Sequence, residues 1–267
     1  MLIFDIWISP PYRDMEEQFL DAPRQAKREA RKKAGLPASP QVGALASVVK
    51  QLRTMIESEL EFTVEDAVFG ATHLAAIYID DVKDICEYAG FKYIIPKSFY
   101  SPVLHETGSA LAGHGFGLCQ HWQNDTQCTL ENHDLPWTYT LAVHYSETAL
   151  TSTHARMRVA VGTFESALGR VENFTMGSNA KDQYPTEAEY WRDVKDTILK
   201  KVREIPWETP DRVILTGEVE DPGFMKALNG AMDEHYGFSP PIYSADSMVV
   251  AAKGNAEFRR RGPADWQ

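Results

Sequence analysis

Residues 212–228 read RVILTGEVEDPGFMKAL, an apolar run that stops at a glycine and is followed by an amphipathic segment. This pattern predicts a strand, a tight turn and a helix. Many nucleotide-binding α/β proteins place a second glycine where Glu218 stands, because a phosphate or an adenine needs the backbone close. The residue at position 218 therefore bears directly on whether the chain can act as an ATPase.

Strand-like and helix-like segments alternate along the rest of the chain. The apolar pattern predicts strands at 2–8, 64–73 (buried) and 92–96, helices at 14–33, 42–60, 79–91 and 186–202, and a strand hairpin at 138–157. We expect Thr186 and Glu189 to form a capping box at the start of the fourth helix, and Gly90 to end the third. The alternation is typical of an α/β fold with mixed sheets.

Composition and charge narrow the classes of partner. The 267 residues are 43% hydrophobic and 24% charged, which allows a sizeable buried core. A net charge of −11 argues against nucleic acid or an anionic membrane as the main partner. We interpret the basic block at 24–35 as a solvated helix face. The sequence has neither a long apolar span nor a signal-like start, so we expect a cytoplasmic protein.

The cysteines leave two alternatives open. Cys86 lies in a helical pattern and is expected to be a buried small hydrophobe. Cys119 and Cys128 could close a small loop by a disulfide, although a cytosolic chain would normally keep them reduced. Neighbouring histidines make a zinc site conceivable, but the spacing matches no zinc-ligand pattern, so no metal is expected.

Five segments, in this order, carry a resemblance to a known superfamily. They are VEDAVFGATH, HETGSALAGHG, TLAVHYSETAL, RVILTGE and DSMVVAAKGNAEF. Together they resemble the ATPase superfamily of actin, hexokinase and the seventy-kilodalton heat-shock chaperones, in particular its divergent fungal members. The resemblance covers residues 42–262. It implies an α/β fold of reduced size with two ribonuclease-H-like lobes around a nucleotide cleft: a first lobe at 1–137, a second at 138–248, and a C-terminal helix at 249–267 that returns to the first.

The resemblance also places the candidate catalytic positions. Glu106 stands where the superfamily has a glutamate near the catalytic water and magnesium. His144 stands at the metal-binding aspartate of the second phosphate loop, and Ser146, Glu147 and Thr148 replace its glycines. Backbone N–H groups of a glycine-rich loop wrap phosphates, whereas a carboxylate repels them. The second phosphate loop is therefore degenerate.

The remaining nucleotide contacts are altered in the same direction. Asp5 is present in the first phosphate loop, but Trp7 and prolines replace its glycine turn. The adenosine segment keeps Thr216 and Gly217 but has Glu218 where the nucleotide must approach. The candidate ligand-binding residues are Asp5, Ser146, Thr148, Thr216, Gly217, Glu218 and Asp246.

Three functions remain at this stage. The first is a degenerate, pseudo-ATPase protein without a cofactor, which binds a small-molecule ligand or a protein partner through the inter-lobe cleft. The second is a biosynthetic enzyme in which Glu106, His144 or His114 performs acid–base chemistry on a small organic substrate. The third, an active ATPase with bound ATP and Mg²⁺, is disfavoured by the altered loops.

Overall fold

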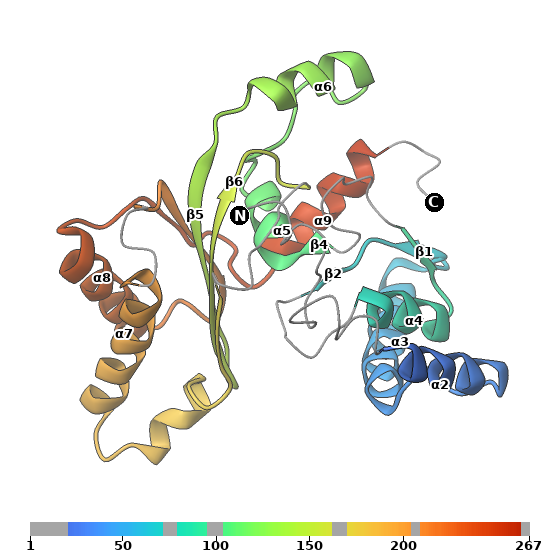
Figure 1. Cartoon of the computed structure of the whole chain (residues 1–267), viewed down its shortest axis with the longest axis horizontal. Helices are drawn as coiled ribbons and strands as arrows, with labels where there is room; N and C mark the ends of the chain where they lie inside the picture. The colour runs from blue at the N-terminus through green and yellow to red at the C-terminus, as the bar shows by residue number, and fades with distance from the viewer. Residues whose placement is uncertain (1–20, 72–78, 95–103, 162–169, 204–208, 263–267) are drawn as a thin grey trace. The chain divides into compact units, whose positions relative to one another are not determined.

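The structure is a computed structural model that describes residues 21–71, 79–94, 104–161, 170–203 and 209–262 (Figure 1). The chain divides into two compact units. The first comprises Met1–Leu104 with Gly262–Gln267, and the second comprises His105–Arg261. The two-residue strand β4 (Leu104–His105) contains the division between them. The lobe boundary expected at 137/138 falls inside the second unit and stays a prediction.

The described part of the first unit is mainly helical. Its elements are α2 (Ala22–Lys33), α3 (Pro40–Leu60), α4 (Ile79–Ala89), β1 (Asp66–Ala67), β2 (Gly70–Ala71) and β3 (Lys92–Tyr93). Ser39 caps α3 by accepting a hydrogen bond from the Val42 N–H at 3.1 Å. Val42 of α3 and Ile85 and Cys86 of α4 form the centre of a small apolar core. The helix predicted at 79–91 is confirmed, and Gly90 follows its end at φ +82°.

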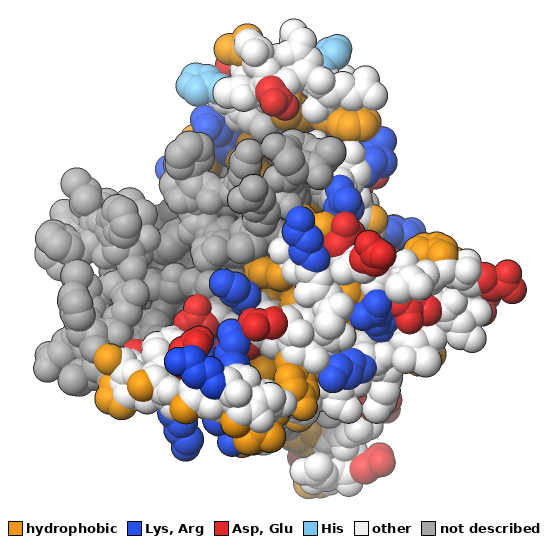
Figure 2. Space-filling model, turned by 90° about the vertical axis from the view of Figure 1, so that its right-hand side faces the viewer, with side chains coloured by type: hydrophobic (Ala, Val, Ile, Leu, Met, Phe, Trp, Pro, Cys, Tyr) orange, Lys and Arg blue, Asp and Glu red, His pale blue; other side chains and the backbone are white. Residues whose placement is uncertain are grey.

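The basic block at 24–35 is not a purely solvated face, which corrects our interpretation. Arg28 is only 4% exposed and forms ion pairs with Asp81 and Asp84 of α4. Lys32 reaches the same Asp84 at 2.9 Å. Elsewhere on the face shown in Figure 2, basic side chains are interspersed with acidic ones. The basic block therefore packs α2 against α4 through ion pairs.

The buried strand predicted at 64–73 is also wrong where the structure describes it. Residues 64–71 contribute only the two-residue strands β1 and β2, with half-buried or exposed side chains. Asp66 and Gly70 interrupt the apolar run, so the segment has no continuous face to bury. The strand predicted at 2–8, and residues 14–20 of the predicted helix, lie outside the described residues.

The second unit is built on a five-stranded mixed sheet with the order β7-β6-β5-β8-β9. Its strands are β5 (Thr138–Tyr145), β6 (Leu150–Met157), β7 (Arg170–Asn173), β8 (Arg212–Gly217) and β9 (Ile242–Tyr243). The predicted hairpin is β5 and β6, which pair antiparallel, and β7 extends it on the outer side of β6. β8 pairs parallel with β5, and β9 pairs parallel with β8. Residues 212–228 form strand β8, a turn and the start of a helix, as predicted.

Helices cover this sheet on both faces (Figure 1). They are α7 (Glu187–Arg203) and α8 (Pro222–Tyr236) on one face and α5 (Glu106–Gly113) and α9 (Val250–Arg261) on the other; the second unit also contains α6 (Asp125–Asp134) and η2 (Ser178–Gln183). Alternate residues of β5, among them Leu141 and Val143, join α7 and α8 in the main apolar core. The intervening positions, such as Thr140 and His144, consequently face the side of α5 and α9. The Thr186 half of the predicted capping box is present at the start of α7, where the Thr186 Oγ1 accepts from the Glu189 N–H at 3.2 Å.

Helices α5 and α9 approach each other closely because glycines lie at their contact. A β-carbon on Gly254 would lie 1.7 Å from the Ser109 carbonyl oxygen, and one on Gly113 would lie 2.0 Å from the Val250 carbonyl oxygen. The Ser109 hydroxyl donates to the Asn255 side-chain oxygen at 2.6 Å across the same contact. This crossing fixes α5, whose first residue is Glu106, against the sheet.

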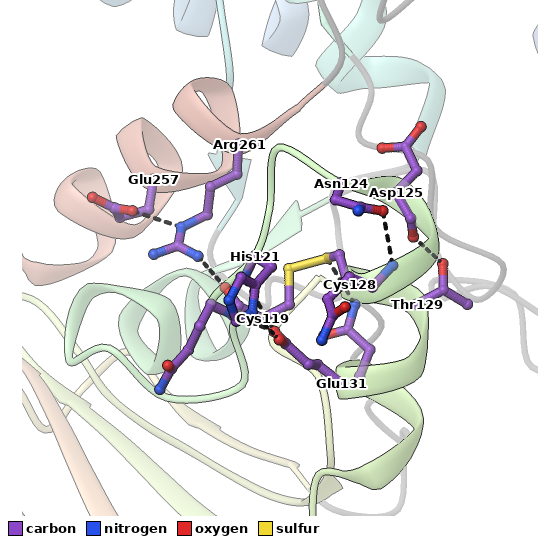
Figure 3. Close-up of a disulfide and its surroundings, with 12 residues drawn as sticks. Cys119, His121, Asn124, Asp125, Cys128, Thr129, Glu131, Glu257 and Arg261 are labelled. Atoms are coloured by element: carbon purple, nitrogen blue, oxygen red, sulfur yellow. Dashed lines mark hydrogen bonds and ion pairs between the residues drawn. A yellow bond between two sulfur atoms is a disulfide. The ribbon is translucent and has the colours of Figure 1, made fainter.

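A disulfide between Cys119 and Cys128 fastens α6 to the loop before it (Figure 3). Arg261 of α9 donates to the Cys119 carbonyl oxygen, which ties the loop to the C-terminal helix. The structure thus settles whether these cysteines pair, and Cys86 is free and buried as expected. Disulfides persist under oxidising conditions, so cytoplasmic location stays a prediction. Of the helices in the described ranges, none is long and apolar enough to cross a bilayer.

The α/β class predicted from the sequence is confirmed by the mixed sheet and its covering helices. Two ribonuclease-H-like lobes are not shown. Among the described residues of the first unit, the strands are only two residues long.

Candidate functional site

The second unit brings three of the predicted residues into direct contact at the carboxyl ends of β5 and β8. His144 and Thr216 are neighbours in the parallel register of these strands. The His144 Nδ1 lies 2.9 Å from the Thr216 hydroxyl and 3.0 Å from the Glu106 carboxylate at the start of α5. We call Glu106, His144, Thr216, Gly217 and Glu218 the His144 cluster. Polar groups that converge at the carboxyl ends of parallel strands are the usual location of ligand sites in α/β sheets.

The charges in the cluster act on the protonation of His144. Its side chain is 24% exposed and that of Glu106 is 17% exposed. Burial alone would lower the pKa of His144, but the hydrogen bond to Glu106 and the charges of Glu106 and Glu218 outweigh it and raise the pKa above the ordinary value. With Nδ1 engaged by Glu106, Nε2 is the ring nitrogen left to bind a ligand or transfer a proton.

The turn after β8 depends on glycine and holds Glu218 beside the cluster. Gly217 has φ +85°, and a β-carbon there would lie 2.1 Å from the Tyr145 carbonyl oxygen. The Glu218 N–H donates to that same oxygen at 2.7 Å. The Ser178 hydroxyl donates to the Glu218 carboxylate at 3.2 Å. Glycine is therefore required here for backbone packing, and Glu218 is held by hydrogen bonds at two points.

The turn between β5 and β6 is closed against η2. The Ser146 N–H donates to the Ala149 carbonyl at 2.9 Å, and the Ser146 carbonyl accepts from the Ser178 N–H at 2.9 Å. A β-carbon on Gly177 would lie 2.3 Å from the Glu147 carbonyl oxygen, so the two turns touch through their backbones. A phosphate loop needs N–H groups directed at the ligand, and that of Ser146 is already engaged within the turn.

Several predicted residues lie away from the cluster. His114 is at the opposite end of α5, about 12 Å along the helix axis from Glu106. Asp246 is exposed and forms an ion pair with Lys253 at 2.6 Å. Thr148 is exposed in the β5–β6 turn. Asp5 lies outside the described residues. Of the predicted acids and bases, Glu106 and His144 are therefore the pair that meets.

Sequence reasoning missed the residues that support the turns. The Ser247 hydroxyl donates to the Gly217 carbonyl at 2.7 Å, and the Ser247 backbone carbonyl accepts from the Gly217 N–H at 3.1 Å. The buried Tyr190 hydroxyl lies 2.9 Å from that of Tyr145 and donates to the Gly177 carbonyl at 2.9 Å. The sequence did offer a signal for Tyr190, because its spacing places it on the buried face of α7. No local pattern marks Ser247.

The part of the chain that the structure describes contains no group of three or more His, Cys, Asp or Glu side chains arranged to hold a metal ion. No protein-family model matches the sequence, and a search of curated proteins returned no similar sequence.

Proposed function

We propose that this chain is a degenerate member of the actin, hexokinase and heat-shock-chaperone ATPase superfamily, and that it binds a ligand at the His144 cluster without hydrolysing ATP. One observation carries the proposal. The position at which the superfamily has a metal-binding aspartate is His144, and this histidine is hydrogen-bonded to Glu106. A hydrogen-bonded histidine that tends to be protonated repels a magnesium ion where the aspartate would attract one.

The topology of the second unit supports the superfamily assignment. Three antiparallel strands, β5 to β7, are followed by β8 and β9, which are parallel to β5 and follow the helices α7 and α8. This order agrees with one ribonuclease-H-like lobe. The packing of α9 on α5 agrees with the expected return of the C-terminal helix to a segment within residues 1–137.

The charges of the cluster favour a ligand other than a nucleotide. Glu106 and Glu218 flank His144, so the cluster keeps a net negative charge even when the imidazole is protonated. A triphosphate would face two carboxylates in place of a metal ion and glycine N–H groups. A neutral or cationic group with an acceptor atom for the His144 Nε2–H fits these charges better.

Calorimetry with Mg²⁺-ATP, and a thermal-shift screen of neutral and cationic metabolites, test this function. We expect no binding of Mg²⁺-ATP at concentrations that saturate a chaperone ATPase domain. A ligand found in the screen should lose affinity at least tenfold in Glu218→Gln but keep it in Glu220→Gln. Glu220 is a suitable control because it is exposed and lies two residues further along the same turn. Tight binding and hydrolysis of Mg²⁺-ATP would contradict the proposal.

A second function, acid–base catalysis on a small organic substrate, is favoured by the hydrogen bond between Glu106 and the His144 Nδ1. A carboxylate in this position orients the imidazole and increases its basicity, so that Nε2 can accept or donate a proton. In that case His144→Gln should abolish product formation while binding of the substrate persists. Binding by the parent chain without any product formation would favour the ligand-binding function.

A further inference from the structure

A second cluster of polar and aromatic side chains lies on the same face of the sheet as His144, near the other ends of the strands. Arg212 and Thr140 are direct neighbours in the parallel register of β8 and β5. Arg212 lies four residues before Thr216 on β8, and Thr140 lies four residues before His144 on β5, which is about 13 Å along each strand. His114, Phe116 and Tyr243 complete what we call the Arg212 cluster.

Arg212 is a partly buried cation that forms no ion pair with any residue that the structure describes. Its guanidinium lies over the Phe116 ring, 4.3 Å from the centroid. Within the described residues it makes neither a hydrogen bond nor an ion pair, and the carboxylate of neighbouring Asp211 accepts instead from the Tyr139 N–H at 2.7 Å. Burial lowers the pKa of Arg212, although nearby Tyr243 and Asp211 oppose this effect. A partly buried cation that forms no ion pair is costly, so its retention calls for an explanation.

Two further polar atoms near Arg212 are buried and have no partner among the described residues. Thr140 is fully buried at 0% exposure, and its hydroxyl makes no hydrogen bond. The Nε2 of His114, at the end of α5, is likewise buried without a partner. Unsatisfied groups of this kind are rare in folded proteins. Their gathering beside an unpaired arginine suggests that one external group satisfies them.

Aromatic rings form the remaining sides of the cluster. The rings of Phe116 and Tyr243 meet edge to face with centroids 4.9 Å apart, and the His114 ring lies 5.7 Å from that of Tyr243. Stacking on Phe116 occupies the face of the Arg212 guanidinium and leaves its in-plane N–H groups available. These N–H groups match the two oxygens of a carboxylate. The adjacent rings offer an apolar surface for the body of the same ligand.

We propose that the Arg212 cluster is a binding site for a small carboxylic acid that carries an aromatic or similarly flat apolar group. The Arg212 N–H groups bind the carboxylate, the Thr140 hydroxyl and the His114 Nε2 contact it from the sheet and from α5, and Phe116 and Tyr243 pack against the ring. This site does not depend on the function proposed for the His144 cluster, because it shares no residue with it.

Benzoate is the probe, and benzamide is its uncharged counterpart. Binding is measured by amide NMR titration of the full chain, with signals of Thr140, Arg212 and Tyr243 as reporters. A ligand of this size binds with a Kd on the order of 1 mM. We expect saturable shifts at these residues with benzoate and at least tenfold weaker binding of benzamide.

Arg212→Gln should abolish the response to benzoate, whereas Arg156→Gln should leave it unchanged. Arg156 is a matched control, since it also lies on a strand with its guanidinium 4.9 Å from an aromatic centroid, that of Trp137, but is exposed. Without ligand, Arg212→Gln should fold and melt at most about 8 °C below the parent chain, because the arginine has no ion pair with the described residues to lose and only its stacking on Phe116 is removed. Absence of saturable shifts up to tens of millimolar benzoate, or full binding by folded Arg212→Gln, would overturn the proposal.

Discussion

Substitution of Gly254 by alanine should destabilise the second unit through a clash at the crossing of α5 and α9. Inside a helix, glycine to alanine normally stabilises by about 0.5–1 kcal/mol. Here the new β-carbon would lie 1.7 Å from the Ser109 carbonyl oxygen, although real contacts begin near 3.0 Å. The helices must therefore separate by about 1.3 Å, and close packing resists this movement.

The cost combines two effects. Overpacking costs about 1–3 kcal/mol, and weakening of the hydrogen bond from Ser109 to Asn255 adds about 1 kcal/mol. After subtraction of roughly 0.5–1 kcal/mol gained in helix propensity, a net loss of about 1–3.5 kcal/mol corresponds to a decrease in Tm of roughly 2–14 °C for a unit of this size.

Differential scanning calorimetry measures the effect, with Gly230→Ala as the control. Gly230 is also inside a helix, α8, but a β-carbon there would lie 3.6 Å from the nearest atom, the Lys195 Cδ, which is an ordinary contact. Gly230→Ala should leave Tm unchanged or raise it slightly. If Gly254→Ala is as stable as Gly230→Ala, the close crossing of α5 and α9 does not exist in solution.

Three further predictions concern charge and covalent links. Because the pKa of folded His144 is raised, the stabilisation from its pair with Glu106 should be complete below pH about 6.5 and disappear as pH rises through the folded pKa. Urea titrations across pH 5–9 measure this dependence of the unfolding free energy, and Glu106→Gln should remove it. An unchanged profile in the variant would refute the prediction. Cys128→Ser, which opens the loop from Cys119, should cost about 2–3 kcal/mol, and equal melting of oxidised and reduced protein would show that the bond adds no stability. Arg28→Ala removes the guanidinium from two buried carboxylates, of which Asp84 keeps its ion pair with Lys32, and should cost about 3 kcal/mol in chemical denaturation, whereas a loss below about 1 kcal/mol would mean that water solvates them.

Much of the second unit could be predicted from the sequence, because its elements have strong local patterns. The hairpin at 138–157 alternates apolar and polar residues, and β8 is an apolar run that ends at a required glycine. The meeting of Glu106 with His144 was reached through the superfamily resemblance, since no local pattern relates residues 38 positions apart.

Other features depend on contacts that no local pattern encodes. Arg28 was interpreted as solvated because a basic run is usually exposed, yet two aspartates of α4 accept it in the interior. That Arg212 makes neither a hydrogen bond nor an ion pair with the described residues is a property of the tertiary structure alone. A lone arginine at the start of a strand gives no indication of whether a carboxylate lies nearby.

The crossing of α5 and α9 has a consequence for the order of assembly during translation. Glu106 is positioned by a helix whose packing partner, around Asn255, is separated from it by most of the second unit. Strands β5 to β8 emerge from the ribosome earlier and can pair before α9 is synthesised. Until then α5 lacks the surface that fixes it, so the nascent chain would carry His144 in a folded sheet without its carboxylate partner in place. The binding proposed for this cluster would thus become possible only once α9 has been synthesised.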